Sequence, residues 1–445
     1  MQLTKSKSKF TLHVVTLLCF SLALNISCEC FADDAPTAND EIHELKTAQF
    51  VIYTDLDKAA AQTHLRGMKT ALANATKYWG RSLKGEIRCY LIEDLSNWKN
   101  YKLPVEQAKL IVRRIGGATI VNPEATAKHR SPQAFIYAST APGVVEHEVI
   151  HAYCFQTFGT AGPDWYREGM AELLAMNATP RKGAVCRERN LDALGADKNP
   201  SLRRILTRTD FTNSIADLIG QNPLQKDGVE FDITPLEDWS KSGSPAMLKA
   251  HVAYAESWAL CYLLYHNPNY QRRFRMVGKH LLTNPRARFE DAFEPMMENI
   301  DFELKQLAQH MGDGYRADLS SWEWNQSFSD IKIGRTVSLQ LKAMAGYQGT
   351  GIKVKSNEKY EIHATGEWIV DQDEPRTTAN GNIDGHGKVE AVLLKDFSLH
   401  SSQVMGEAAT YFSTKDGHLY LRCHDDWRQL ADNRGVIKVR IKRIQ

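Results

Sequence analysis

The sequence predicts an α+β protein with more than one domain, and three observations indicate this. Residues 49–140 alternate between strand-like and helix-like apolar patterns, residues 141–317 carry mainly helical spacing, and residues 318–445 consist of short alternating segments between turn residues. The chain of 445 residues also exceeds what a single hydrophobic core usually holds. We therefore expect a small α/β lobe and a helical lobe that together form one domain, followed by an all-β sandwich.

The first 32 residues have the pattern of an export signal. Three lysines precede a mostly apolar stretch at residues 10–26, and Ala32 is a small residue suited to cleavage. Residues 33–48 then form an exposed N-terminal segment. The alternatives are a lipid attached at Cys28 and a retained membrane anchor. Cleavage predicts an extracytoplasmic protein, which is periplasmic, at the cell surface or secreted, with no transmembrane span.

The charge balance bears on nucleic-acid binding, and the cysteines bear on a disulfide-rich fold. The 55 lysines and arginines nearly match the 53 aspartates and glutamates, and no basic stretch is sustained, which argues against a nucleic-acid partner. After signal removal the cysteines are odd in number and irregularly spaced, so they are not a disulfide framework, although one or two bridges are compatible with an oxidising compartment. These are Cys89, Cys154, Cys186, Cys261 and Cys423.

The α/β lobe is predicted from residue patterns between positions 49 and 140. Apolar and β-branched runs predict strands, and the spacing after Asp57 predicts an amphipathic helix. The expected strands cover residues 49–54, 87–92, 119–121 and 134–137, and the expected helix covers residues 57–79.

The next element is a helix over residues 144–157 that carries two histidines. His147 and His151 are four residues apart, so in a helix their imidazoles share a face and can bind one metal ion. Glu148 lies beside them and can accept a proton from a metal-bound water without binding the metal. The alternative interpretation is a pair of surface or core histidines without a metal.

A catalytic zinc ion usually has three protein ligands, and Glu168 can supply the third. The segment 159–164 contains two glycines and a proline, which indicates a turn, so a second helix beginning near Trp165 can return towards the histidines. Glu172, one helical turn after Glu168, is then placed to hold a ligand histidine through its other ring nitrogen.

These motifs resemble those of a known family. The string His147-Glu-Val-Ile-His151, followed by WYREGMAELL, resembles the gluzincin metallopeptidases, and most closely the bacterial peptidase MA-like group with its Trp-x-x-Glu-Gly-x-Ala-Glu motif. The resemblance implies a zincin-type domain that acts on a peptide or protein substrate. It also implies that Zn²⁺ is bound by His147, His151 and Glu168, with Glu148 as the catalytic base.

In zinc peptidases an edge strand beside the metal-binding helix pairs with the extended substrate. Gly117 and Ala118, at the start of the third predicted strand, are the candidates for this substrate-binding role, because a glycine permits close approach of another backbone. The alternative is an ordinary bend before a strand.

The helical lobe contains a further candidate for catalysis. Helical spacing, interrupted by Asn-Pro pairs, recurs up to about residue 311. The stretch from His251 to Leu260 resembles the Tyr-Ala-x-Ser-Trp-Ala segment that follows the zinc motifs in the same peptidase group. By that resemblance Tyr254 donates a hydrogen bond to the oxyanion, with His251 as the second candidate. The alternative for each is a residue satisfied by helical packing. The expected helices are 202–206, 251–266, 270–282 and 302–311.

The C-terminal region is predicted to be a β-sandwich. β-branched residues alternate with polar ones in short runs after residue 330, with turn signals between them. The expected strands cover residues 337–342, 351–355, 360–364, 419–423 and 435–441.

The loop between the last two predicted strands resembles the calcium-binding loop of galactose-binding bacterial lectins with a jelly-roll fold. The resemblance implies Ca²⁺ ligands at Asp425, the Gln429 carbonyl, Asp432 and Asn433, and oxygen atoms of this kind suit a hard cation. The upstream Gly-Trp segment of those lectins is not matched here, so sugar recognition does not follow. The alternative is an acidic, solvated loop.

Taken together, the sequence predicts an exported zinc metallopeptidase with an appended sandwich that binds carbohydrate or tethers the enzyme. Two alternatives remain from the same residues. The chain is instead a non-catalytic cell-surface or carbohydrate-binding protein with a structural metal site, or an envelope protein without any metal.

Overall fold

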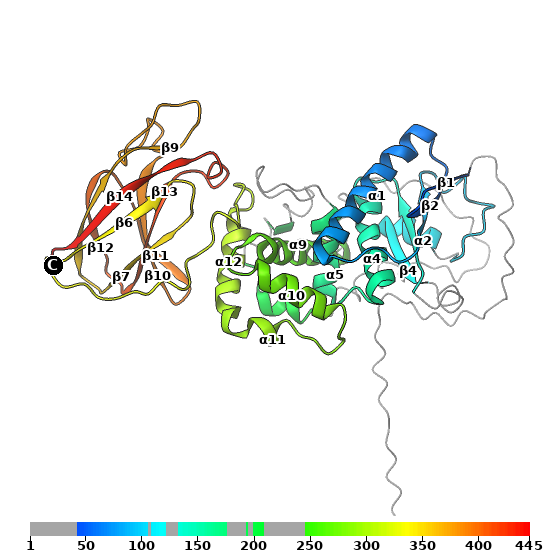
Figure 1. Ribbon diagram of the computed structural model, residues 1–445, viewed down its shortest axis with the longest axis horizontal. Coiled ribbons are helices and arrows are strands. Elements are labelled where there is room, and N and C mark those ends of the chain that lie inside the picture. The colour runs from blue at the N-terminus through cyan, green and yellow to red at the C-terminus, as the bar shows by residue number, and fades with distance from the viewer. Residues whose placement is uncertain (1–41, 106–107, 122–131, 176–192, 195–198, 209–244) are drawn as a thin grey trace, which may run out of the picture.

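The structure is a computed structural model that shows three parts in a row: an α/β lobe, a helical lobe and a β-sandwich (Figure 1). The predicted export signal lies outside the described residues, as do positions 33–41 of the segment that follows it. Among the helices that are described, none combines the length and the apolar character needed to cross a lipid bilayer. The described residues are 42–105, 108–121, 132–175, 193–194, 199–208 and 245–445.

The α/β lobe is built on a five-stranded sheet in the order β1-β2-β3-β5-β4. The central strands β2, β3 and β5 are parallel, whereas β1 pairs antiparallel with β2, and β4 pairs antiparallel with β5 at the opposite edge. The N-terminal segment 33–48, which was expected only to be exposed, therefore contributes the edge strand β1. The bounds are β1 His43–Lys46, β2 Phe50–Thr54, β3 Ile87–Ile92, β4 Gly117–Val121 and β5 Ala134–Ser139.

Two layers cover this sheet, because successive side chains of a strand point to opposite faces. Cys89 and Leu91 of β3 join the core that contains α1 (Lys58–Trp79) and α4 (Val144–Phe158), while Tyr90 joins a smaller cluster that contains α2 (Ala108–Ile115). The N-terminus of α1 is capped by the Asp57 carboxylate, which accepts hydrogen bonds from two main-chain N–H groups at 2.8 Å. The sheet and α1 together hold α4 in a buried position.

The helical lobe is organised around α9 (Pro245–His266), which packs against α5 (Asp164–Ala175) along much of its length. The two helices approach closely at Gly169, where a Cβ atom would lie 2.3 Å from the Ser257 carbonyl oxygen. Only glycine fits at this crossing. The other elements are α7 Leu202–Leu206, α10 Gln271–Leu281, α11 Glu290–Phe293, the 3₁₀ turn η3 Glu294–Met296 and α12 Met297–His310.

The C-terminal region is a sandwich of two antiparallel sheets with their own core between them. One sheet has the order β11-β10-β13-β7 and the other β12-β8-β14-β6, with β9 paired to β14. The bounds are β6 Thr336–Lys342, β7 Gln348–Val354, β8 Lys359–Thr365, β9 Trp368–Ile369, β10 Lys388–Lys395, β11 Ser398–Met405, β12 Ala408–Phe412, β13 Gly417–His424 and β14 Arg434–Arg443.

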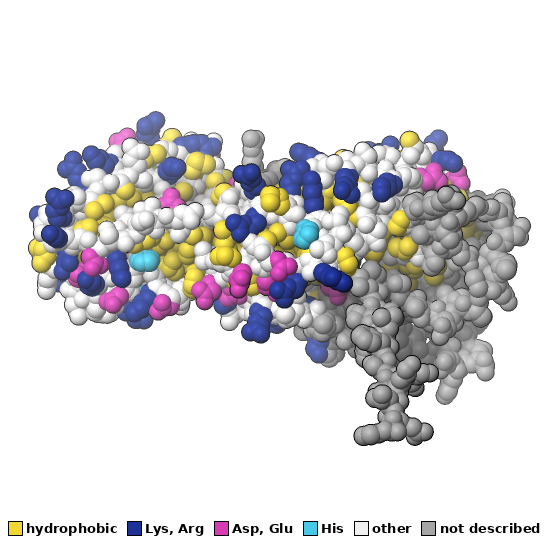
Figure 2. Space-filling model, turned by 60° about the horizontal axis from the view of Figure 1, so that its bottom comes forward, with side chains coloured by type: hydrophobic (Ala, Val, Ile, Leu, Met, Phe, Trp, Pro, Cys, Tyr) yellow, Lys and Arg dark blue, Asp and Glu magenta, His cyan; other side chains and the backbone are white. Residues whose placement is uncertain are grey.

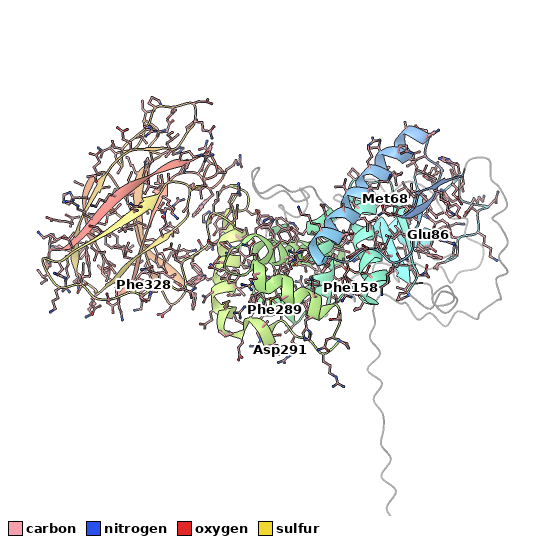
Figure 3. All side chains as sticks on the ribbon, viewed as in Figure 1. Met68, Glu86, Phe158, Phe289, Asp291 and Phe328 are labelled. Carbon is pink, nitrogen blue, oxygen red and sulfur yellow. The ribbon has the colours of Figure 1, made fainter. Side chains whose placement is uncertain are left out.

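The sandwich is docked on the helical lobe through aromatic side chains. The rings of Trp322 and Tyr420 have centroids 4.7 Å apart, and those of Trp324 and Phe397 are 5.9 Å apart. Phe328, labelled in Figure 3, follows Trp322 and Trp324 in the segment that leads into the sandwich, and its ring stacks on that of His418. One continuous hydrophobic core therefore runs from the α/β sheet to the outer face of the β10–β13 sheet.

No disulfide bridge, which the sequence left open, joins the described cysteines. Cys89, Cys154, Cys261 and Cys423 are all free and buried, and burial raises the pKa of each thiol. Cys186 lies outside the described residues. The described cysteines contribute to packing and form no covalent cross-link.

Charges on the surface are mixed. Figure 2 shows Lys and Arg side chains spread along the length of the displayed face, with acidic and apolar side chains among them. On this face the basic side chains form no continuous stripe.

Candidate metal centre

The metal motif lies on α4, which is buried on nearly all sides. The helix begins after Gly143 and ends at Gly159, both with positive φ angles (78° and 85°) that favour glycine. His147 and His151 point from one face of this helix, with ring centroids 4.7 Å apart. Both histidines are less than a tenth exposed. The packing of α4 therefore fixes the direction of both imidazoles.

Glu168 approaches these rings from α5, which follows the turn at Gly162-Pro163. Its Oε2 atom lies 3.2 Å from the Nε2 atoms of both His147 and His151, and those two nitrogens are 3.0 Å apart. Two ligand atoms that each lie about 2.0–2.1 Å from a tetrahedral zinc ion are themselves about 3.3 Å apart. The three side chains thus form a triangle close to one face of a zinc coordination tetrahedron, and they fit such an ion.

Two further residues support His147 and Glu168 from outside the triangle. Glu172 Oε1 lies 3.0 Å from Nδ1 of His147, the ring nitrogen that faces away from the triangle. Arg167 donates from Nε to Glu168 Oε1 at 2.7 Å, and its Nη1 lies 3.0 Å from Asp164 Oδ1. Arg167 was not singled out in the sequence, although it directly precedes Glu168 in the second motif.

The charges around the triangle favour a cation. Burial raises the pKa of Glu168, but His151 and Arg167 outweigh this effect and hold that pKa well below its usual range. Burial lowers the pKa of His147, but contacts with Glu168 and Glu172 outweigh it and raise that pKa to about 9. The buried carboxylates of Glu168 and Glu172 therefore favour a positive charge at the histidines, carried either by a proton or by a metal ion.

Glu148 is held by the edge strand of the sheet. The Thr119 hydroxyl in β4 lies 2.8 Å from Glu148 Oε2 and 2.9 Å from the Glu148 main-chain oxygen. Glu148 is 7% exposed and Thr119 also 7%. The carboxylate thus stays buried beside the histidines with one oxygen engaged by a neutral donor. Thr119 was part of a predicted strand, but nothing in the sequence indicated that it faces Glu148.

The structure places the two oxyanion candidates on α9. The Tyr254 ring has its centroid 5.9 Å from that of His147, at an interplanar angle of 67°. His251 lies one turn earlier on the same helix and is partly buried. This ring contact places Tyr254 next to His147 of the metal triangle.

The predicted substrate strand, β4, occupies an edge of the sheet next to α4. β4 pairs with β5 alone among the described strands. Gly117 is needed for packing, since a Cβ atom there would meet Val144 Cγ1 at 2.8 Å and the Tyr137 oxygen at 3.1 Å. The close approach expected at Gly117 is thus made by Val144 and Tyr137 of the same chain. Ala118 is the first residue of β4 that has a side chain.

The C-terminal loop places several oxygen atoms in a buried position without donors. Asp425 Oδ2, Asp432 Oδ1 and Asn433 Oδ1 have no hydrogen-bond partner among the described residues. Burial, followed by the charges of Asp425 and Asp371, raises the pKa of Asp432. The Gln429 carbonyl accepts from Asp432 N at 3.1 Å. Unsatisfied, electrostatically coupled oxygens of this kind fit a hard cation such as Ca²⁺.

No protein-family model matches this sequence, and no curated protein matches it. Among solved structures, a PllA-like lectin described as the EclA N-terminal domain aligns with 24% of this chain and 94% of its own, at 20% identity and a TM-score of 0.21. The IMPa metallopeptidase from Pseudomonas aeruginosa aligns with 92% of this chain and 42% of its own, at 10% identity and a TM-score of 0.15.

A mutant of a functionally unknown conserved protein from Bacillus anthracis str. Ames aligns with 24% of this chain and 21% of its own, at 16% identity and a TM-score of 0.16. The matched regions span less than half the length of the Bacillus anthracis protein and of the metallopeptidase. At these TM-scores the likenesses decide neither fold nor activity.

Proposed function

We propose that this protein is an exported zinc-dependent metallopeptidase of gluzincin type. The observation that carries the proposal is the triangle of His147, His151 and Glu168, with edges of 3.0–3.2 Å, together with the buried carboxylate of Glu148 beside it. A purely structural metal site has no need of such a carboxylate. The resemblance of the motifs to gluzincins, and the signal-like first 32 residues, support the same proposal.

The residues of the site then divide the work of peptide hydrolysis. Zinc bound by the triangle would lower the pKa of a water molecule and polarise the scissile carbonyl. Glu148 accepts the proton of the attacking water and returns it to the leaving amine. Tyr254 donates a hydrogen bond to the developing oxyanion. The open edge of β4 at Ala118 offers main-chain hydrogen bonds to an extended peptide.

The substitution Glu148→Gln tests this proposal. We expect one zinc ion per chain to remain while hydrolysis of a proteome-derived peptide library falls by about 10²–10⁴-fold, because the amide cannot accept the proton. Glu146→Gln, the same change two positions earlier in α4, is the matched control and keeps its activity. Tyr254→Phe removes only the hydroxyl and lowers kcat.

Unchanged hydrolysis in Glu148→Gln at full zinc content would exclude the peptidase mechanism. Bound zinc without any hydrolysis by the natural protein would instead leave a non-catalytic cell-surface protein with a structural metal site. A metal content near zero in the purified protein would exclude both of these functions.

For the sandwich we propose Ca²⁺ binding in the loop from Asp425 to Asn433, with carbohydrate as a candidate partner. The three donorless oxygens support the cation, and the loop supplies four of the 6–8 oxygens that calcium takes. Equilibrium dialysis with radioactive calcium tests the site. Binding by the natural protein, and its loss in Asp432→Asn, is the expected result.

A further inference from the structure

The loop between β13 and β14, residues 425–433, has two sides that carry different chemistry. One side holds the donorless oxygens of Asp425, Asp432 and Asn433. Asp425 and Asn433 are nearly fully buried, at 4% and 0% exposure. Leaving such oxygens without a donor or a cation is costly in a folded protein. The other oxygen of Asp425, Oδ1, accepts from Asp426 N at 2.8 Å and lies 3.3 Å from His386 Nδ1. Without a cation, the charges of Asp425 and Asp432 would repel each other.

The other side of the loop lies on the helical lobe. The Trp427 ring centroid is 5.3 Å from that of His310, at the end of α12, and 5.1 Å from that of Tyr315. The Arg428 guanidinium donates to the Gly312 carbonyl oxygen at 3.0 Å. Nine consecutive residues therefore supply both the oxygen cluster and one end of the contact between the two domains.

Arg422 connects the two sides of this loop. Its guanidinium lies 4.1 Å above the Trp427 ring and donates to the Asp425 main-chain oxygen at 3.2 Å. Glu390 accepts from Arg422 at 2.7 Å and fixes it in the β10–β13 sheet. Arg422 thus contacts both Trp427, which packs on the helical lobe, and the backbone of Asp425, the first of the proposed cation ligands.

We infer that the 425–433 loop is a calcium-dependent clamp between the sandwich and the helical lobe. The cation neutralises Asp425 and Asp432 and holds the loop in the conformation that seats Trp427 and Arg428 on residues 310–315. The inference rests on the proposed calcium site. The aromatic contacts of Trp322 and Trp324 lie outside this loop, so calcium removal releases one end of the junction without separating the domains.

Hydrogen–deuterium exchange of the full mature chain tests the clamp, with zinc kept saturating and Mg²⁺ as the control cation. At a Ca²⁺ concentration of 100 times Kd, opening that releases the ion becomes about 100-fold rarer. We expect this slowing in the 425–433 loop, and slower exchange in residues 310–315 as well. In Asp432→Asn both effects disappear. Asp396→Asn, an exposed acid in the β10–β11 turn, keeps both.

Trp427→Ala separates the clamp from the calcium site. This variant retains every proposed ligand, so calcium still protects the loop but no longer protects residues 310–315. The clamp is refuted if calcium protects the loop of the natural protein and leaves residues 310–315 unchanged, an outcome that preserves the calcium site. Absence of any calcium effect on the loop removes both the site and the clamp.

Discussion

At the residue scale, the Thr119 hydroxyl decides which oxygen of Glu148 is available for chemistry. A hydroxyl carries one proton, and Thr119 lies within hydrogen-bond distance of Oε2 and of the main-chain oxygen of Glu148. Oε2 is the nearer of these two acceptors, at 2.8 Å, and it lies on the side of β4. The remaining oxygen, Oε1, is the one left to accept a proton from water.

Thr119→Val keeps the shape of the side chain and removes this donor. A hydrogen bond to a charged group contributes about 1.5–3 kcal/mol, so we expect kcat to fall by about 10-fold to 100-fold. KM and zinc content should change little, because neither depends on the hydroxyl. Thr119→Ser restores the donor and should restore most of the rate. A valine variant with normal kcat would show that Glu148 needs no such support.

The sequence predicted the residues of the metal triangle and one of their supports, Glu172, but not the other two. His147, Glu148 and His151 share one helix, so their spacing alone fixes their relative positions. Glu168 follows after one short turn, which leaves little freedom. Thr119 and Arg167 were not predicted, because their roles depend on strand register and on side-chain direction, which no spacing in the sequence reveals.

At the scale of elements, the crossing of α5 and α9 sets the position of Glu168. Gly169 follows Glu168, and its Cα faces the α9 backbone at Ser257 without any side chain between them. Three residues before Ser257 stands Tyr254. The metal ligand and the proposed oxyanion donor are therefore placed relative to each other by a direct backbone contact.

Gly169→Ala tests this contact. The added methyl group would lie 2.3 Å from the Ser257 oxygen and 2.6 Å from Cys261 Sγ, so the helices must move apart. We expect a loss of about 1–3 kcal/mol in the free energy of unfolding, together with weaker zinc binding. Gly312→Ala is the control, because no atom lies within 4 Å of its added methyl group. Chemical denaturation and zinc competition measure the two effects.

A second element-scale prediction concerns Glu303 on α12. This fully buried carboxylate accepts from Trp324 Nε1 at 2.5 Å, from the Tyr270 hydroxyl at 3.0 Å and from Asn267. Burial raises the pKa of Glu303 to about 7, although these three donors lower it. Because the pKa of Glu303 in the folded protein lies above its usual value, the unfolded chain loses this proton at a lower pH than the folded protein does. The contribution of Glu303 to the free energy of unfolding is therefore full below about pH 4.5 and is lost as the pH rises through about 7.

Glu303→Gln should therefore flatten the pH dependence of stability between pH 4.5 and 7. The difference in unfolding free energy between the natural protein and the variant is expected to change by about 3 kcal/mol over that range. Glu298→Gln, an exposed position on the same helix, is the control. Parallel pH profiles for the natural protein and Glu303→Gln would show that this carboxyl does not titrate as described.

Several elements were predicted to within a few residues, and β10 is an instructive failure. β3 and α7 have the expected bounds, and α1 and α4 differ by one residue at an end, since each has a clear period and clear end signals. β10 was missed because its sequence KVEAVLLK does not alternate: six of its eight residues are buried, facing the sandwich core on one side and the helical lobe on the other. A strand buried on both faces loses the period on which sequence prediction depends.

At the scale of the whole molecule, the order of the parts follows from the sequence but their docking does not. Changes in residue pattern located the α/β lobe, the helical lobe and the sandwich. The aromatic residues of the junction are scattered between positions 302 and 427, so no local pattern brings them together. The boundary expected at residue 318 therefore divides a segment that belongs to both domains.

The shared core at this junction has an evolutionary consequence. Val392, Leu394 and Tyr420 point out of the sandwich and belong to the same apolar cluster as Trp322 and the helices before it. A gene fragment encoding the sandwich alone, joined to an unrelated domain, would leave this apolar face exposed and would favour self-association. Recombination should therefore exchange the helical lobe and the sandwich together, and substitutions on the two surfaces of their junction should occur together.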